Sequence, residues 1–165
     1  MKQFYFLFIG ILISFFSFAQ VEGASKVYGY KQKVMPGTIR VDENGNAVPK
    51  KSQYNYYFYL ASSSKVTPAE LWIDGEAYSV TSVEVKTTPV EYKNATGNSN
   101  SKLLVPKTTR RVLQLSPSVD KLQKPNTKAK ALSLKNELVI IYKGGGKSYY
   151  KTISKLGELE PLAMQ

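Results

Sequence analysis

The chain has 165 residues, no cysteine and no histidine, and its formal net charge at neutral pH is +11. The lack of cysteine excludes disulfides, thiolate metal sites and the lipid-modified cysteine of a bacterial lipoprotein. The lack of histidine excludes Ser-His-Asp and Cys-His catalytic arrangements, so an enzyme would depend on carboxylates, lysine or tyrosine. We therefore expect a protein that is not an enzyme and that uses no cofactor or metal.

The first 19 residues have the three parts of a secretory signal peptide. Lys2 is their only charged residue, and residues 4–18 are almost wholly apolar. Ser17 and Ala19 supply the small side chains that a cleavage site before Gln20 requires. An uncleaved anchor is the alternative, but the apolar run is shorter than the ~20 residues of a spanning helix. We expect cleavage and export to the periplasm or extracellular space, without a lipid anchor or a transmembrane span in the mature chain.

Residues 20–165 predict one domain of short strands. The stretches 26–34 and 53–61 predict the first two strands, because aromatic and β-branched residues favour extended backbone. In the second stretch, alternation divides the side chains into two faces: Tyr54, Tyr56, Phe58 and Leu60 on one, and Asn55, Tyr57 and Tyr59 on the other.

A hairpin is predicted in the middle of the chain. The apolar run 71–73 and the run 76–80 flank Asp74 and Gly75, which form a favoured two-residue turn. Thr67–Glu70 also has the composition of a helix start, so one helical turn before the hairpin is the alternative.

Most of the charge lies in one segment. Residues 94–135 contain nine basic residues and one acidic residue, Asp120, which gives a net charge of +8. Within this segment, 102–106 and 110–116 predict short strands, and Pro117–Lys130 is expected to be extended or mobile. A concentrated charge of this kind suggests a partner of opposite charge.

The last clear strands follow this segment. Residues 138–142 are an unbroken apolar run, which is typical of a strand buried on both faces. Gly144–Gly146 then turns the chain into 147–153, and the tail 154–165 has no firm assignment. The pattern as a whole predicts an all-β fold, a single β-sandwich of about seven to nine short strands, with an immunoglobulin-like arrangement as one form and a small barrel as the alternative.

Three short patterns resemble functional motifs but lack their context. Residues 144–148 end like a phosphate loop, but position 141 is Ile where that motif needs glycine, and strand signals lie on both sides, so a hairpin turn is favoured. The carboxylate pairs Asp42 with Glu43 and Asp74 with Glu76 lie in turns, where solvated carboxylates are common. The third pattern is a partial calcium loop of Asp42, Asn44 and Asn46, which lacks the glycine at its sixth position and the final glutamate.

Tyrosine and lysine supply the candidate interaction surface. Tyrosine joins an apolar ring to a polar tip and is enriched at interfaces, although it is also a common half-buried strand residue. Exposed basic residues either bind polyanions or only keep a protein soluble. The candidate residues are Tyr57, Tyr59, Arg110, Arg111, Lys121, Lys124, Lys128 and Lys130.

These features favour one function over two others. The leading hypothesis is a non-catalytic exported interaction module, an accessory or structural subunit of the cell envelope that binds a protein partner through strand edges or the tyrosine face. The alternative is a domain that binds an acidic glycan or an anionic lipid headgroup through the basic segment. An enzyme without histidine is a distant third, and nucleic acid is disfavoured as the partner of an exported chain.

Overall fold

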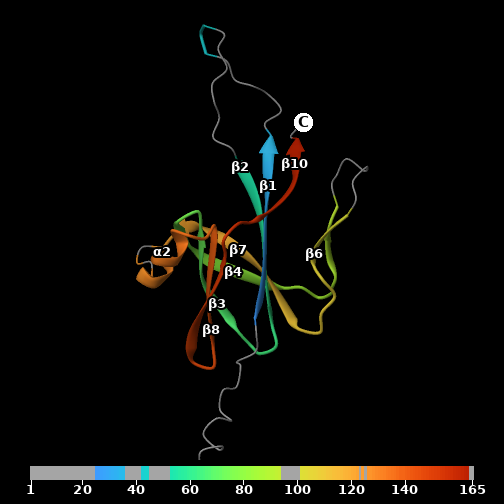
Figure 1. The fold of residues 1–165 in the computed structure, drawn as a ribbon, viewed down its shortest axis with the longest axis vertical. Helices are drawn as coiled ribbons and strands as arrows, with labels where there is room; N and C mark the ends of the chain where they lie inside the picture. The colour runs from blue at the N-terminus through green and yellow to red at the C-terminus, as the bar shows by residue number, and fades with distance from the viewer. Residues whose placement is uncertain are drawn as a thin grey trace, which may run out of the picture.

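The computed structural model describes residues 25–35, 42–44, 53–93, 101–122, 124 and 126–163. The expected signal peptide lies outside these residues. The described residues form ten strands and one short helix (Figure 1), so the all-β expectation is confirmed. The elements are β1 (Lys26–Met35), β2 (Gln53–Ser62), β3 (Thr67–Ile73), β4 (Glu76–Glu84), β5 (Val90–Tyr92), β6 (Lys102–Val105), β7 (Arg111–Lys121), α2 (Thr127–Ser133), β8 (Leu138–Gly144), β9 (Lys147–Ile153) and β10 (Gly157–Ala163).

Eight of the strands form one sheet in the order β10-β1-β2-β7-β4-β3-β8-β9, and β5 pairs with β6 in a separate hairpin. The pairs are antiparallel except for β1 with β10, which run parallel. The sheet curls into a half-barrel (Figure 1), which lies closer to the small-barrel alternative than to two separate packed sheets. The strand number exceeds the expected seven to nine partly because the unassigned tail forms β10.

The main core fills the inside of the curl. Its buried side chains come mainly from two pairs of neighbouring strands, β2 with β7 and β3 with β8, which lie on either side of β4 in the sheet order. The core residues are Phe58, Leu60, Val66, Leu71, Ile73, Leu113, Leu115, Leu138, Ile140, Tyr142 and Leu156. The curl brings β1 against the end of β9, where a Cβ added at Gly29 would lie 2.7 Å from Cδ2 of Leu156 and 2.9 Å from Cδ1 of Ile153.

Two smaller clusters cover the outside of the sheet. The β5–β6 hairpin contributes Leu104 and Val105, which pack with Tyr59 and Val112. Helix α2 contributes Ala129, which packs with Trp72, Val139 and Ile141. The second half of β2, from Phe58 to Ser62, is therefore buried on both faces. So are Leu138–Tyr142 of β8, as the apolar run 138–142 predicted.

Both predicted hairpin turns are present. Asp74 and Gly75 have φ values of 49° and 85° and join β3 to β4. Gly145 and Gly146 have φ values of 54° and 78° and join β8 to β9, so residues 144–148 form a hairpin turn and not a phosphate loop. The alternative of a helical turn at Thr67–Glu70 is wrong, because these residues belong to β3.

The basic segment, residues 94–135, contains more regular secondary structure than expected. Its described residues include β6, β7 and α2, so the expectation that Pro117–Lys130 is extended or mobile is wrong for Thr127–Lys130, which belong to α2. The helix forms because the side chain of Asn126 caps it, accepting a hydrogen bond from the N–H of Ala129 at 3.1 Å. Ala129 then anchors the helix against Trp72.

Candidate functional site

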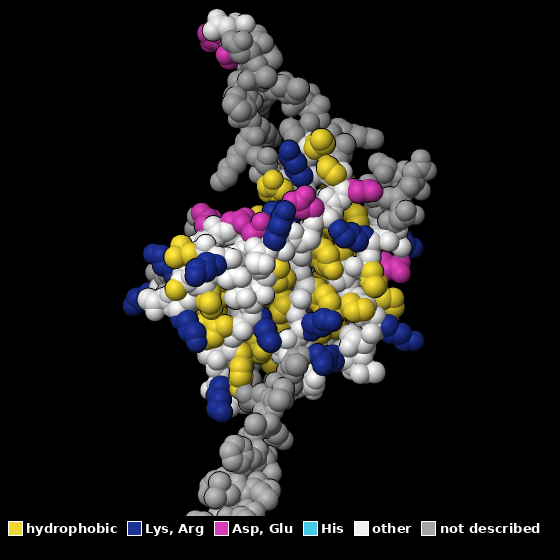
Figure 2. Space-filling model, viewed as in Figure 1, with side chains coloured by type: hydrophobic (Ala, Val, Ile, Leu, Met, Phe, Trp, Pro, Cys, Tyr) yellow, Lys and Arg dark blue, Asp and Glu magenta, His cyan; other side chains and the backbone are white. Residues whose placement is uncertain are grey.

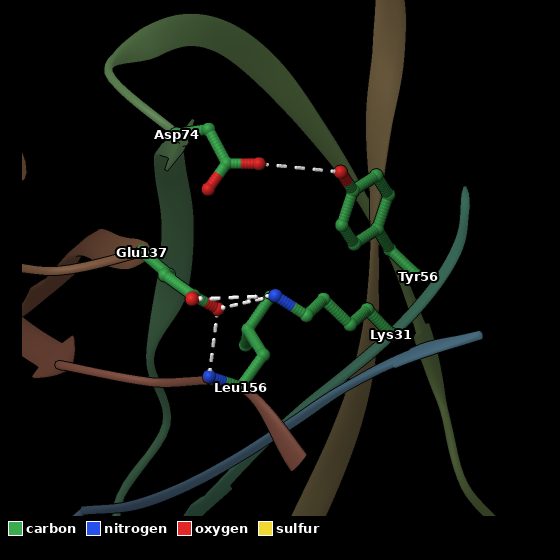
Figure 3. Close-up of polar contacts among 5 residues, drawn as sticks. All are labelled: Lys31, Tyr56, Asp74, Glu137 and Leu156. Atoms are coloured by element: carbon green, nitrogen blue, oxygen red, sulfur yellow. Dashed lines mark hydrogen bonds and ion pairs between the residues drawn. The ribbon is translucent and has the colours of Figure 1, made fainter. Parts of the chain in front are cut away.

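A polar cluster links separate strands at the end of the half-barrel that carries the Asp74–Gly75 turn (Figure 3). The Nζ of Lys31 lies 3.2 Å from Oε1 and 3.1 Å from Oε2 of Glu137. Oε2 of Glu137 also accepts the backbone N–H of Leu156 at 2.9 Å. These bonds connect β1, the residue before β8 and the β9–β10 turn. The cluster therefore holds the curl together where the sheet nearly closes.

The two charged groups stabilise each other's ionised form. Burial alone would lower the pKa of Lys31, but the hydrogen bond and charge of Glu137, with the charges of Asp74 and Glu158, raise it. Burial alone would raise the pKa of Glu137, but the bonds from Leu156 and Lys31 lower it. Both pKa values move away from neutrality. Neither group is therefore suited to general acid–base catalysis near pH 7.

Two tyrosines extend the cluster along the rim. The hydroxyl of Tyr56 donates to Oδ2 of Asp74 at 3.4 Å, and the hydroxyl of Tyr78 donates to Oε2 of Glu76 at 2.6 Å. Burial and the Asp74 carboxylate raise the pKa of Tyr56 to about 12. The Glu76 hydrogen bond and burial raise the pKa of Tyr78 to about 12. Both hydroxyls therefore stay protonated at neutral pH and act as donors to the two carboxylates.

The other candidate carboxylates take part in local structure. Oδ1 of Asp42 accepts the backbone N–H of Asn44 at 2.9 Å, which closes a local turn. Asn46, the third member of the calcium-like pattern, lies outside the described residues. Among the residues that the structure describes, no three His, Cys, Asp or Glu side chains are grouped as a metal site.

The tyrosine face is not an exposed surface. Tyr59 is buried, with 4% of its surface exposed, because the β5–β6 hairpin covers this part of the sheet. Tyr57 is half-buried, its ring 5.9 Å from that of Tyr92, and its hydroxyl donates to Oε1 of Gln32 at 3.2 Å. The expectation that Tyr57 and Tyr59 lead an exposed interaction face is therefore wrong for Tyr59. Tyr57 is only partly exposed.

A buried amide explains why this hairpin sits so closely on the sheet. Gln32 is 1% exposed, and its Nε2 donates to the hydroxyl of Tyr92 and to the backbone oxygen of Glu160, the latter at 2.9 Å. Together with the bond from Tyr57, this joins β1, β2, β5 and β10 in one network. A fully satisfied buried network of this kind fixes the arrangement of the elements that it connects.

The predicted basic residues do not form one patch. Arg111 begins β7 and pairs with Glu84, with Nη2 2.7 Å from Oε2, and Arg110 is half-buried beside it. Lys121 ends the same strand, so it lies at the other end of β7 from Arg111. The side chain of Lys121 lies outside the description.

The remaining predicted lysines lie near or on the helix. Lys124 and Lys130 are exposed, and Nζ of Lys128 lies 4.6 Å from the ring centroid of Tyr150 on β9. The basic residues predicted from the sequence are thus divided between the two ends of β7. In Figure 2, acidic side chains gather along the upper part of the body, whereas basic side chains are spread over the rest of this face.

The sheet ends at β9, which in the described part of the chain pairs only with β8. Residues that flank a two-residue turn form a hydrogen-bonded pair, here Gly144 and Lys147, and bonded pairs recur at every second position. The N–H and C=O groups of the intervening residues, Ser148, Tyr150 and Thr152, therefore point away from β8. They form an unpaired sheet edge within the described residues.

The opposite end of the sheet, β10, is less suited to pairing. It contains Pro161, which has no N–H, and the acidic residues Glu158 and Glu160. Proline on an edge strand hinders the addition of another strand, because it has no N–H to donate. Strand β9 contains no proline, so it offers the more continuous row of donors and acceptors.

The described residues contain no helix with the length and apolarity that crossing a membrane requires. Comparisons with protein-family models, with curated proteins and with solved structures find no match. The function of the chain is therefore inferred from its own residues.

Proposed function

We propose that this protein is an exported, non-catalytic interaction module of the cell envelope that binds a protein partner by accepting one of the partner's strands at the edge of β9. The single observation that carries this proposal is the row of outward N–H and C=O groups on Ser148, Tyr150 and Thr152. An extended peptide that adds to such an edge gains main-chain hydrogen bonds, and side-chain contacts then provide specificity.

The surroundings of β9 support this role. Its inner face is anchored by Tyr149, whose ring stacks on that of Tyr142 at 5.5 Å, and its outer face by Tyr150, which packs against α2. The hydroxyl of Tyr150 also accepts a hydrogen bond from Nδ2 of Asn126 at 3.1 Å. A rigid edge loses little conformational freedom when a partner binds, which favours affinity.

The polar cluster around Lys31 supports a non-catalytic role. Its lysine and carboxylate are already paired, and their pKa values are shifted away from the range in which proton transfer at neutral pH is efficient. We assign this cluster to the stability of the half-barrel. The export part of the proposal depends on the apolar residues 4–18 and on Ser17 and Ala19.

Docking of a partner strand at β9 can be tested with substitutions that remove one outward N–H of this strand. Thr152 is exposed, and Thr152→Pro would remove its N–H and place a ring in the path of an added strand while the bonds to β8 remain. Thr152→Val keeps the N–H and the β-branched shape, so it is the matched control. Ser148→Pro repeats the test at an independent position.

The experiment is affinity purification of the tagged full chain, made with its own leader in its native host and cross-linked before extraction. A partner recovered with the wild type and Thr152→Val, but lost with Thr152→Pro and Ser148→Pro, would support the proposal. Equal recovery with all four proteins would contradict docking at β9. Mass spectrometry of the same material is expected to find an N-terminus at or near Gln20, and an intact leader would contradict cleavage.

A further inference from the structure

We infer that the β9 edge selects a partner strand in which two acidic residues flank an apolar or aromatic residue, in the order acidic-x-apolar-x-acidic. This inference rests on the proposed function, because it names the chemistry of the strand that would dock there. It starts from the charge around the edge. Residues 138–157 contain four lysines and no acidic residue; the lysines are Lys143, Lys147, Lys151 and Lys155.

The register of the β8–β9 hairpin divides these cations between the two faces of the edge. Lys147 and Lys151 pair with Gly144 and Ile140, so they share the inner face with Tyr149. On the outer face, Lys143 lies opposite Ser148, and Lys128 from the helix lies over Tyr150. An added strand would therefore meet positive charge on both faces.

The inner face fixes a spacing for the partner. Directly opposed side chains in a sheet approach within about 5 Å, and side chains on one face recur at every second residue. Partner residues opposite Lys147 and Lys151 are therefore four positions apart, and the residue midway between them faces the half-buried ring of Tyr149. Opposite charges at the outer positions and an apolar side chain at the middle one give the favourable cross-strand pairs.

A second copy of this chain does not meet that requirement. Antiparallel pairing of two β9 strands about Tyr150 would place Lys147 opposite Ile153 and Lys151 opposite Tyr149 of the copy, so neither lysine would meet an acidic residue. Antiparallel pairing about Tyr149 would place Lys147 opposite Lys151 of the copy, and parallel pairing in register would place each lysine beside its equivalent. Like charges in these positions destabilise the pair, and lysine on an edge strand is a common protection against self-association. The same lysines attract an acidic strand, so the edge discriminates between the two occupants.

The length available to the partner is set by the curl of the sheet. At its end, β9 reaches β1, because Cδ1 of Ile153 lies close to Gly29. Lys147 to Thr152 therefore form the part of the edge on which the partner would lie. This part contains both inner lysines and all three residues with outward main-chain groups.

The inference can be tested by NMR titration of the purified full chain with synthetic peptides. The probe is Thr-Glu-Thr-Val-Thr-Glu-Thr, which carries the predicted pattern. Its controls have Gln in place of both Glu, Lys in place of both Glu, or the two Glu side by side in a scrambled order. We expect the Gln peptide to bind about tenfold more weakly than the Glu peptide, because two cross-strand charge pairs are lost.

Charge reversal provides the strictest control. The double variant Lys147→Glu, Lys151→Glu is expected to prefer the Lys peptide over the Glu peptide, with the preference of the wild type inverted. Equal affinities for the Glu and Gln peptides, both abolished by Thr152→Pro, would overturn the acidic pattern and leave docking at β9 intact. Binding of the Glu peptide that survives Thr152→Pro would overturn both. No binding by any peptide would overturn the acidic pattern, while the purification of the cross-linked partner still decides the docking site.

Discussion

Lys31 and Glu137 lie 106 positions apart in the chain, yet the Lys31 ammonium contacts both carboxylate oxygens of Glu137, at 3.1 and 3.2 Å. The side chains are only 18% and 26% exposed. The pair joins β1 to the start of β8, and these strands lie near opposite ends of the sheet order. The Glu137 carboxylate also accepts a hydrogen bond from the N–H of Leu156. We interpret the pair as an interaction that stabilises the curled shape of the half-barrel.

Glu137→Gln should lower the free energy of unfolding by about 1–3 kcal/mol, because Lys31 loses the partly buried carboxylate that it contacts. The single tryptophan, Trp72, is buried and reports unfolding by urea through its fluorescence. The matched control is Glu84→Gln, which breaks the more exposed pair with Arg111 and should cost less than about 1 kcal/mol. Equal effects of the two substitutions would contradict this stabilising role of Glu137.

The contribution of Glu137 should depend on pH in a defined direction. Its pKa in the folded protein is lower than the usual glutamate value near 4.5. The stabilisation is therefore present above that value and is lost as the pH falls through the folded pKa. The difference in unfolding free energy between wild type and Glu137→Gln should be constant from about pH 5 to 8 and shrink in more acidic solution. A difference that grows with acidification would contradict the assigned pairing.

Tyr56 and Tyr78 should ionise late in an alkaline titration followed by ultraviolet absorbance. Both have a pKa of about 12, raised above the usual value of 10. Each group therefore stabilises the fold below pH 10, and this stabilisation is lost as the pH rises through the folded pKa. Tyr78→Phe should remove one of the late-titrating groups and leave the earlier tyrosines unchanged. Removal of an early-titrating group by this substitution would contradict the hydrogen bond to Glu76.

Ile140 tests the central position of β8 in the core. Its side chain is fully buried, and Ile140→Ala should cost ~2–5 kcal/mol from the lost transfer free energy and the remaining cavity. Val83→Ala removes a similar side chain that is 71% exposed, and it should change stability by less than about 0.5 kcal/mol. Urea denaturation measures both. A cost below that control value for Ile140→Ala would place β8 at the surface.

Local sequence patterns predicted the parts of this fold that depend on neighbouring residues. Tight hairpin turns need backbone with positive φ, so the turns at Asp74-Gly75 and within Gly144–Gly146 were predicted from residue type alone. The unbroken apolar run 138–142 predicted burial on both faces of β8 for the same local reason.

The candidate site depended on distant contacts, which local patterns do not reveal. The alternation in β2 predicted an exposed face for Tyr59, but the paired strands β5 and β6 cover it. The helix α2 was not predicted, because the lysine-rich and proline-rich composition of its surroundings favoured an extended or mobile segment. Asn126 before Thr127 was nevertheless a recognisable cap signal. The lysines of the β9 edge were not predicted as a binding feature. Their shared face is established by the hairpin register, which places Lys147 and Lys151 on the same side of the sheet.

Amide hydrogen exchange measured residue by residue is the most direct test of docking at β9. In the free protein, the N–H groups of Ser148, Tyr150 and Thr152 should exchange rapidly, while those of Tyr149 and Lys151, which bond to β8, should be protected. Addition of the peptide Thr-Glu-Thr-Val-Thr-Glu-Thr should slow exchange at the three outward amides in particular. Binding that leaves these three amides unprotected, or that protects a different strand, would contradict the account.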